Sequence, residues 1–215
     1  MQIEEINFTN EKYPKQLREI YNPPKKIYAI GNIEILNEIG IAIVGSRKAT
    51  EYGKKVALKL SQDLSKNKIV IISGLAKGID SYAHIGTLNV KDGKTIAVLG
   101  SGIKEIYPKE NIELARKIVK NGGCIISEYF PNDKPNKMNF PERNRIISGL
   151  SKGVVIVEAS EKSGALITAD FALEQGREVF AVPGDIYSNT SIGTNKLIQQ
   201  GAKLVTECED ILSEI

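Results

Sequence analysis

Seven short apolar runs, rich in valine and isoleucine, recur along the chain without alternating with polar residues. Strands buried on both faces of a sheet have this composition, whereas strands with one face in water alternate apolar and polar residues. The runs cover residues 41–45, 69–73, 95–100, 124–127, 154–158, 178–182 and 203–205. They predict a mostly parallel sheet with helices on both faces.

Helix-like segments separate these runs, at residues 52–66, 79–88, 111–121, 166–175 and 195–200. In the first segment, Val56, Ala57, Leu60 and Leu64 form one apolar stripe at helical spacing. Strand and helix therefore alternate, which predicts an α/β domain with right-handed crossovers.

The two ends of the chain differ from its centre. Pro14, Pro23 and Pro24 prevent a long helix near the N-terminus. We therefore expect residues 1–38 to form a short N-terminal extension that packs on a domain made of residues 39–215. The acid-rich residues 207–215 predict a short final helix.

Composition excludes several classes of protein. The 215 residues include two cysteines and one histidine, and the formal net charge is only +3. That is too few side chains for a disulfide framework or a multi-histidine metal site. No apolar stretch reaches the roughly 18 residues of a membrane span, and the polar, acidic N-terminus does not read as a signal peptide. We expect a cytoplasmic protein without a metal or cofactor.

Glycine and serine dominate the residues that follow the predicted strands. Ligands bind at the carboxyl ends of the strands in an open parallel sheet, so these loops are the place to look for a site. They cover residues 45–47, 73–80, 100–102, 158–165 and 183–185. Such loops let backbone N–H groups approach an anion at a helix N-terminus. Together they predict an anion-binding rim.

The common nucleotide-binding motifs do not fit. Gly93-Lys94-Thr95 is similar to the end of a Walker A loop, but Leu88 occupies the position of the first glycine. The segment from Gly100 starts like a dinucleotide-binding turn, but Glu105 replaces the third glycine.

A basic segment, residues 134–152, carries five cationic side chains against one acid, Glu142. The cations are Lys134, Lys137, Arg143, Arg145 and Lys152, and Phe140 lies among them. Pro135 and Pro141 predict that its first half is extended. Single-stranded nucleic acid needs cations for its phosphates and an aromatic ring for a base. A solvated basic turn with Phe140 in the core is the alternative, and the segment alone does not decide between them.

Several motifs, in this order along the chain, together resemble one family. They are residues 43–47 (IVGSR), 73–80 (SGLAKGID), 140–150 (FPERNRIISGL), 157–159 (VEA), 163–169 (SGALITA), 181–184 (AVPG) and 193–198 (GTNKLI). The resemblance is to the bacterial DprA/Smf family of DNA-processing proteins, and it extends from about Tyr13 to Leu212.

The resemblance implies an extended Rossmann-like domain that binds single-stranded DNA without catalysis. It also implies a homodimer and the loading of RecA recombinase onto DNA in natural transformation. Carried over motif by motif, the resemblance implies a phosphate-binding turn made of Gly45, Ser46 and Arg47, and a basic pocket lined by Lys137, Arg143 and Arg145. It also implies that Phe140 stacks on a base and that Asn144 and Gly164 donate hydrogen bonds to the DNA backbone. The winged-helix domain of many family members has no counterpart in these 215 residues.

Two other functions share this topology. Rossmann-like phosphoribohydrolases carry a Pro-Gly-Gly-x-Gly-Thr-x-x-Glu turn, and residues 163–170 lack its paired glycines and its glutamate. The second of these functions is that of a small-molecule binding module, such as a carrier of the molybdenum cofactor.

Three polar residues outside the basic segment have structural explanations. His84 is expected to pack inside the domain, and Asp80 to cap a helix. Glu158 either accepts hydrogen bonds from loop N–H groups or is the remnant of a catalytic carboxylate.

Overall fold

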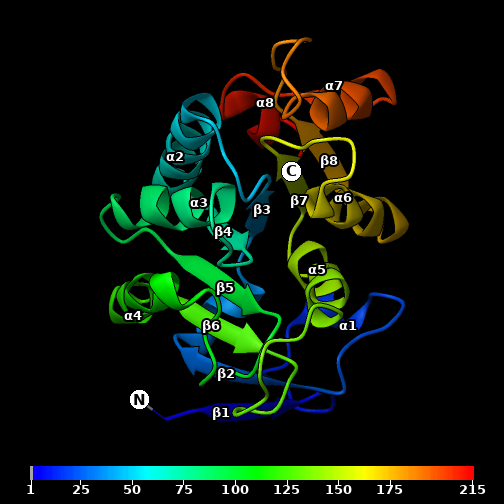
Figure 1. Ribbon diagram of the computed structural model, residues 1–215. Coiled ribbons are helices and arrows are strands. Elements are labelled where there is room, and N and C mark those ends of the chain that lie inside the picture. Colours follow the sequence, from blue (N-terminus) through cyan, green and yellow to red (C-terminus); the bar gives the residue numbers. More distant parts are fainter. Residues whose placement is uncertain (1) are drawn as a thin grey trace.

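One nine-stranded sheet runs through the protein, and helices cover both of its faces (Figure 1). The structure is a computed structural model and describes residues 2–215. The strands are β1 (Glu4–Asn7), β2 (Lys26–Gly31), β3 (Gly40–Val44), β4 (Val70–Ser73), β5 (Thr95–Leu99), β6 (Cys124–Ser127), β7 (Gly153–Ile156), β8 (Glu178–Ala181) and β9 (Lys203–Leu204). The expected α/β class with a mostly parallel sheet is confirmed.

The order of the strands creates a switch point beside β3. Across the sheet the order is β1-β2-β6-β5-β4-β3-β7-β8-β9, and the strands from β3 to β9 are all parallel. From β3 the chain moves outward through β4, β5 and β6, and then returns to β7 on the other side of β3. The loops after β3 and β7 therefore diverge, which leaves the crevice where ligands bind in such sheets.

The helices follow the strands as the sequence predicts, except that α1 and α5 were not expected. They are α1 (Lys15–Arg18), α2 (Glu51–Lys66), α3 (Ile79–Leu88), α4 (Ile112–Lys120), α5 (Asn139–Gly149), α6 (Gly164–Glu174), α7 (Ile192–Gln199) and α8 (Glu209–Leu212). Two short 3₁₀ helices, η1 (Ile33–Asn37) and η2 (Lys109–Asn111), complete the set.

Neighbouring residues of each central strand pack against opposite helix layers. Ile71 of β4 belongs to a core cluster with Leu60 and Leu64 of α2, whereas Ile72 belongs to a second cluster with Ile146 of α5. Because successive strand side chains point to opposite faces, a strand with helices on both sides must be apolar throughout. This is the physical reason for the unbroken apolar runs.

The first 38 residues extend the sheet. β1 pairs with β2, and β2 pairs antiparallel with β6, with Tyr28 opposite Ser127. Tyr13 is buried, and its hydroxyl donates a 2.7 Å hydrogen bond to the carbonyl of Pro24, which ties the two proline-containing turns together. The division of the chain between residues 38 and 39 stays a prediction.

The prediction of an extended chain up to Pro141 is wrong, because α5 begins at Asn139. Pro141 lies in the first turn of α5, where a backbone N–H has no acceptor within the helix. Proline is tolerated there because it lacks that N–H and its φ suits the helix. Within residues 2–215, no helix has the length and apolarity needed to cross a membrane.

Candidate functional site

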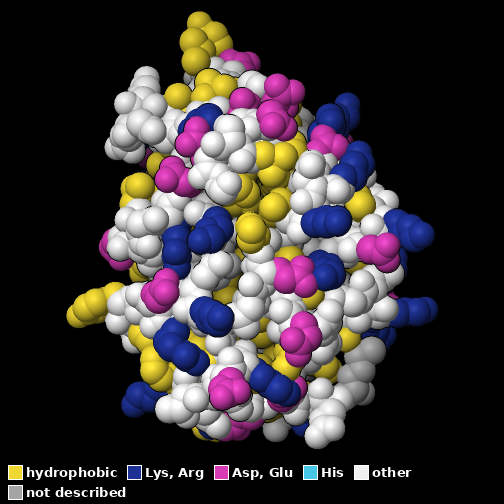
Figure 2. Space-filling model, turned by 180° about the vertical axis from the view of Figure 1, so that it is seen from behind, with side chains coloured by type: hydrophobic (Ala, Val, Ile, Leu, Met, Phe, Trp, Pro, Cys, Tyr) yellow, Lys and Arg dark blue, Asp and Glu magenta, His cyan; other side chains and the backbone are white. Residues whose placement is uncertain are grey.

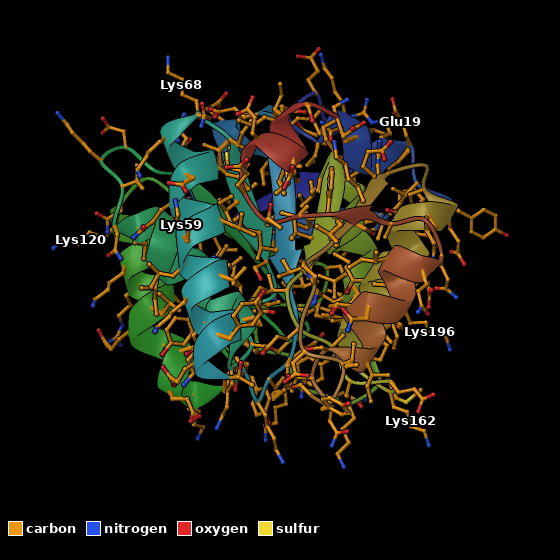
Figure 3. The ribbon with its side chains drawn as sticks, turned by 90° about the horizontal axis from the view of Figure 1, so that it is seen from above. Glu19, Lys59, Lys68, Lys120, Lys162 and Lys196 are labelled. Atoms are coloured by element: carbon orange, nitrogen blue, oxygen red, sulfur yellow. The ribbon has the colours of Figure 1, made fainter. Side chains whose placement is uncertain are left out.

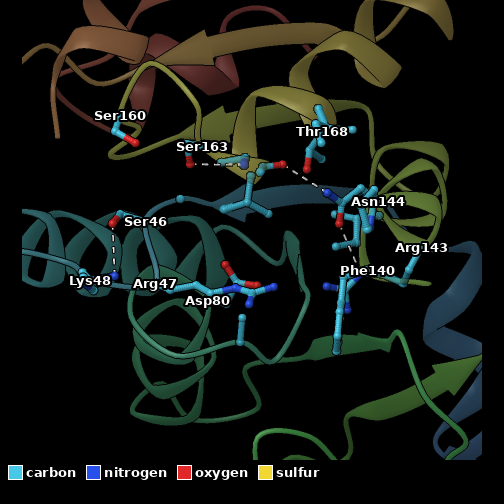
Figure 4. Close-up of a pocket in the computed structure, with 18 of the residues that line it drawn as sticks. Ser46, Arg47, Lys48, Asp80, Phe140, Arg143, Asn144, Ser160, Ser163 and Thr168 are labelled. Atoms are coloured by element: carbon cyan, nitrogen blue, oxygen red, sulfur yellow. Dashed lines mark hydrogen bonds between the residues drawn. The ribbon is translucent and has the colours of Figure 1, made fainter. Parts of the chain in front are cut away.

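A cavity of about 540 Å³ opens at the switch point beside β3. Its walls come from the loop after β3, from α5, and from the loop that leads into α6 (Figure 4). Eight of the nine site residues predicted from the sequence line this cavity, which we call the switch-point pocket. They are Gly45, Ser46, Arg47, Lys137, Phe140, Arg143, Asn144 and Gly164.

The loop after β3 presents its side chains rather than its backbone amides. The N–H of Ser46 donates to the carbonyl of Glu158 (2.8 Å), and the Ser46 hydroxyl accepts from the N–H of Lys48 (3.1 Å). These amides are therefore already engaged. Arg47 and Lys48 are both exposed at the pocket. An anion at this turn would consequently meet a guanidinium and an ammonium group.

Phe140 is a half-buried wall of the pocket rather than a core residue. Its ring lies against Gly100, where an added Cβ would stand 2.7 Å from the ring. The ring of Tyr107 lies 5.5 Å from that of Phe140 at an interplanar angle of 42°. The Arg47 guanidinium lies 5.4 Å from the centroid of the Phe140 ring, within cation–π range. A cation and an aromatic ring thus stand side by side in the pocket.

Arg143 forms a fixed cation at the pocket floor. It is only 4% exposed, and its Nη1 donates to the carbonyls of Gly74 (2.9 Å) and Val98. Burial lowers the pKa of Arg143 to about 10, while the nearby Asp80 carboxylate acts in the opposite direction. The guanidinium therefore remains charged at neutral pH. Its position is set by backbone carbonyls and not by solvent.

Asp80 faces Arg143 across Gly74. Its Oδ2 accepts a 3.0 Å hydrogen bond from the N–H of Gly74, and the side chain is buried in the first turn of α3. Burial raises the pKa of Asp80, and the charge of Arg143 opposes that shift. An added Cβ on Gly74 would lie 2.6 Å from the guanidinium and 2.7 Å from the carboxylate, so glycine leaves both groups their space.

Asn144 and Gly164 join α5 to the start of α6. The Asn144 Nδ2 donates to the carbonyl of Gly164 (3.2 Å), and Ser163 caps α6 by accepting from the N–H of Ala165 (3.3 Å). No heavy atom lies within 4 Å of a Cβ added at Gly164, so the space beside this residue is open. The N–H groups of this first helical turn have no acceptor within the helix and carry the positive end of its dipole.

Arg145 does not line the switch-point pocket. Its guanidinium forms two hydrogen bonds with the Glu128 carboxylate (2.7 and 2.6 Å), and its Nε donates to the carbonyl of Asn22 (3.0 Å). Residues two apart on a helix point about 200° away from each other, so Arg143 and Arg145 cannot share one side of α5. The grouping of the two arginines in one pocket was carried over from the family resemblance.

Sequence reasoning missed several pocket residues. Lys48 adds a second cation beside Arg47, and Tyr107 adds a second ring beside Phe140. The pocket lining holds four cationic side chains and one acidic side chain, Asp80. On the face that Figure 1 turns away, cations and acids are interspersed (Figure 2). The signal for Lys48 was its place directly after Arg47 at a strand end.

The side chains of Glu158 and His84 are both buried and hydrogen-bonded inside the fold. Glu158 is buried, and its carboxylate accepts from the N–H (2.9 Å) and the hydroxyl of Thr50, at the start of α2. His84 is fully buried against Thr95. Within residues 2–215, no group of three or more His, Cys, Asp or Glu side chains is arranged to hold a metal ion.

The fold and the pocket together define an α/β domain of Rossmann-like type with a cationic, aromatic crevice at its switch point. The family model of DNA recombination-mediator protein A matches residues 4–215. The chain is 47% identical over 214 residues to the DNA processing protein DprA of Bacillus subtilis, covering 99% of this chain and 71% of that protein. The chain belongs to this family of DNA recombination mediators, whose members are also named Smf.

Solved structures agree with this assignment. The X-ray structure of DNA processing protein A from Streptococcus pneumoniae is 45% identical, with a TM-score of 0.93, over 100% of this chain and 75% of that chain. DNA processing protein A from Helicobacter pylori, described for its single-stranded DNA binding mode, is 32% identical, with a TM-score of 0.88, over 99% of this chain and 95% of that chain. A molybdenum cofactor binding protein from Rippkaea orientalis, at 18% identity and a TM-score of 0.56 over 81% of this chain and 92% of that chain, shares the fold alone.

Proposed function

We propose that this chain binds single-stranded DNA in the switch-point pocket. The observation that carries the proposal is the pairing of Arg47 with the ring of Phe140, 5.4 Å apart, in a cavity with a cationic lining. A base can stack on the half-buried ring while its phosphate meets the exposed guanidinium. The family relationship supports the same ligand, because the similar Helicobacter pylori protein is described for its single-stranded DNA binding.

The pocket suits an unpaired base better than a duplex. In a duplex the base faces are stacked on one another, and a base reaches a pocket only after costly unstacking. The two helices that line the pocket pack one face into the core, α5 through Ile146 and Ile147 and α6 through Ala165 and Ala169. Readout by stacking and by phosphate charge is tolerant of sequence. The proposed binding is therefore selective for single strands and weakly selective for bases.

Two variants separate the electrostatic and stacking parts of this proposal. Arg47→Ala removes one phosphate contact, so single-stranded DNA affinity should fall and the slope of log affinity against log salt should flatten by about 0.7. Phe140→Ala removes about 1–3 kcal/mol of stacking per base and should leave the slope unchanged. The measurement is a salt titration of oligothymidylate binding by fluorescence anisotropy.

Lys120→Ala serves as the matched control, because Lys120 is an exposed cation on α4 that points away from the molecule (Figure 3). Its loss changes the net charge as Arg47→Ala does, without touching the pocket. Thermal melts show whether Phe140→Ala stays folded. A folded Phe140→Ala protein that binds like the parent would remove the ring from the site. An Arg47→Ala protein with the parent's salt slope would contradict the phosphate contact.

Self-association is proposed as well, on the family resemblance. Within residues 197–212, Leu197, Val205 and Ile211 are buried in their own chain, while Leu204 is 43% exposed. We expect a homodimer, with a mass twice that of the 23.6 kDa chain, by light scattering at tens of micromolar. A monomer mass at that concentration would contradict the dimer.

The remaining parts of the proposal concern the setting in which the chain acts. We propose that it works in the cytoplasm as a binding protein without catalysis and loads RecA recombinase onto incoming DNA in natural transformation. The side chains of Glu158 and His84 are hydrogen-bonded inside the fold, and neither reaches the pocket, which supports a non-catalytic role.

A further inference from the structure

The loop between β6 and α5 holds an exposed phenylalanine in a fixed position. Phe130 is 60% exposed, although a large apolar side chain is normally withdrawn from water. The loop turns tightly after it: the N–H of Asp133 donates to the Phe130 carbonyl, and the Asp133 carboxylate accepts from the N–H of Phe130, both at 2.9 Å. The exposure of the ring is therefore built into an ordered turn.

A second set of hydrogen bonds ties this turn to the loop after β5. The N–H of Gly102 donates to the Asp133 carbonyl (2.8 Å), and the N–H of Lys104 donates to the Pro131 carbonyl (2.9 Å). A Cβ at Gly102 would collide with the carbonyls of Phe130 and Pro131. The close approach of the two loops therefore requires glycine at this position. A rigid support of this kind keeps the entropic cost of using the ring low.

Phe130 is accompanied by a cation and by a second ring. The Nζ of Lys26 lies 4.9 Å from the centroid of the Phe130 ring and 5.4 Å from that of Tyr28, and the two rings are 6.0 Å apart. Lys26 also pairs with the exposed Glu5 at 3.3 Å. Ring and cation repeat the combination found in the switch-point pocket, where Arg47 lies over Phe140.

This second cluster lies on the same edge of the sheet as the pocket. β2 runs antiparallel to β6, so its first residues lie beside the carboxyl end of β6. The two sites also share one supporting loop: Phe140 packs on Gly100, and the Phe130 carbonyl packs on Gly102. Two residues of extended chain span at most about 7 Å, so the supports of the two rings are close neighbours.

We propose that Phe130, with Lys26 beside it, is a second stacking site for a base of the same DNA strand, a few nucleotides away from the base held at Phe140. The occupant is single-stranded nucleic acid because the cluster continues the edge of the pocket and combines a base-sized apolar face with a cation. This inference rests on the proposed function.

The competing explanation is that Phe130 only covers Tyr28, which is 5% exposed. The two explanations predict different effects of DNA length on how much the loss of Phe130 weakens binding. A thymidine dinucleotide fills one site, whereas an oligothymidylate of about sixteen nucleotides can span both. If Phe130 is a second site, its loss weakens binding of the long strand only.

The experiment compares Phe130→Ala, Arg47→Ala and the parent on both oligonucleotides, by fluorescence anisotropy with thermal melts alongside. Phe130→Ala should weaken long-strand binding by about 5- to 150-fold and leave short-strand binding unchanged. Ile39→Ala is the matched control, because Ile39 is 52% exposed and directly precedes β3, at the opposite end of the strands. It should match the parent on both strands.

Each remaining outcome has one meaning. Equal weakening of both strands by Phe130→Ala would overturn the second site and make Phe130 a support of the pocket. If Phe130→Ala binds both strands like the parent while Arg47→Ala binds both more weakly, the second site is overturned and the proposed function stands. Parental binding by Arg47→Ala would contradict the proposed pocket itself.

A photochemical readout covers the case in which Phe130→Ala fails to fold. A long oligothymidylate with a single 5-iodouracil, moved one position at a time, is irradiated on the unaltered protein. Crosslinks should form both to the peptide of Phe130 and to that of Phe140. Crosslinks that never reach Phe130 at any position would overturn the second site.

Discussion

Replacing Arg143 with methionine should lower the free energy of unfolding by about 3–5 kcal/mol, the cost of leaving a buried charge without the opposite charge that compensates it. The guanidinium is 4% exposed and donates to the carbonyls of Gly74 and Val98. Its loss leaves those acceptors and the buried Asp80 carboxylate without their compensating charge. Urea denaturation followed by circular dichroism, without DNA, measures the change.

A second variant identifies the cause of that loss. In Arg143→Met with Asp80→Asn, no uncompensated carboxylate remains, so much of the lost stability should return. A double variant as unstable as Arg143→Met would show that packing, and not charge, dominates. An Arg143→Met protein as stable as the parent would contradict the compensation of Asp80 by Arg143.

The position of Arg143 gives the pocket a division of labour. Arg143 is fixed by the backbone of two strand ends and supplies charge from the floor. Arg47 and Lys137 are exposed and can follow a phosphate. Loss of Arg143 would therefore impair DNA binding through the fold, whereas loss of Arg47 would impair it at the surface. The unfolding measurement distinguishes these two causes of weak binding.

The central strands were predictable because each is buried on both faces. Their runs match the observed strands to within two residues at each end. The first two strands, β1 and β2, were not predictable in this way. In β1, Glu4 and Glu5 lie outside the core. The strand β2 pairs with β1 and β6, and only the tertiary structure brings these two strands beside it. Strand pairing that depends on distant segments leaves a weaker local signal.

α5 was missed for a different reason. Pro141 and a cluster of charged residues suggested a loop, but the proline falls in the one turn that tolerates it. The helix then carries Arg143 inward and Arg145 to Glu128. A charged residue that is buried by pairing cannot be told from a solvated one in a single sequence, because only the fold supplies the partner.

The pocket residues at strand ends were predictable from topology alone. A parallel sheet brings the loops that follow its strands to one edge, so Arg47 and Gly164 meet although they are far apart in sequence. Tyr107 required the actual course of the loops. The same limit applies to Phe130, whose exposure depends on the turn at Asp133.

Stability should fall as the pH drops below about 6.5, by up to about 1.4 kcal/mol per pH unit, because of His84. The Thr95 hydroxyl donates to the Ile71 carbonyl (2.6 Å), so it can only accept from His84 Nδ1, 2.7 Å away. The proton therefore sits on Nδ1. His84 Nε2 is buried and has no hydrogen-bond partner among residues 2–215. A second proton would place a charge there without any acceptor.

Burial, with a smaller contribution from the charge of Arg143, lowers the pKa of His84 from 6.5 to about 3. Between these two values the unfolded chain binds a proton that the folded chain does not. The stability from neutral His84 is therefore complete above pH 6.5 and is lost progressively as the pH falls toward 3. The raised pKa of Asp80 acts in the opposite sense. A comparison with a His84 variant cancels that contribution.

His84→Gln is that variant, since its amide can still donate to Thr95 and does not titrate. Urea unfolding of both proteins at several pH values between about 7 and about 4.5 gives the difference in unfolding free energy, which should narrow as the pH falls. The narrowing, and not the stability at any one pH, carries the result, because glutamine has its own packing cost. Parallel stability curves across this range would show that His84 takes its proton equally well in both states, and would contradict a buried neutral imidazole.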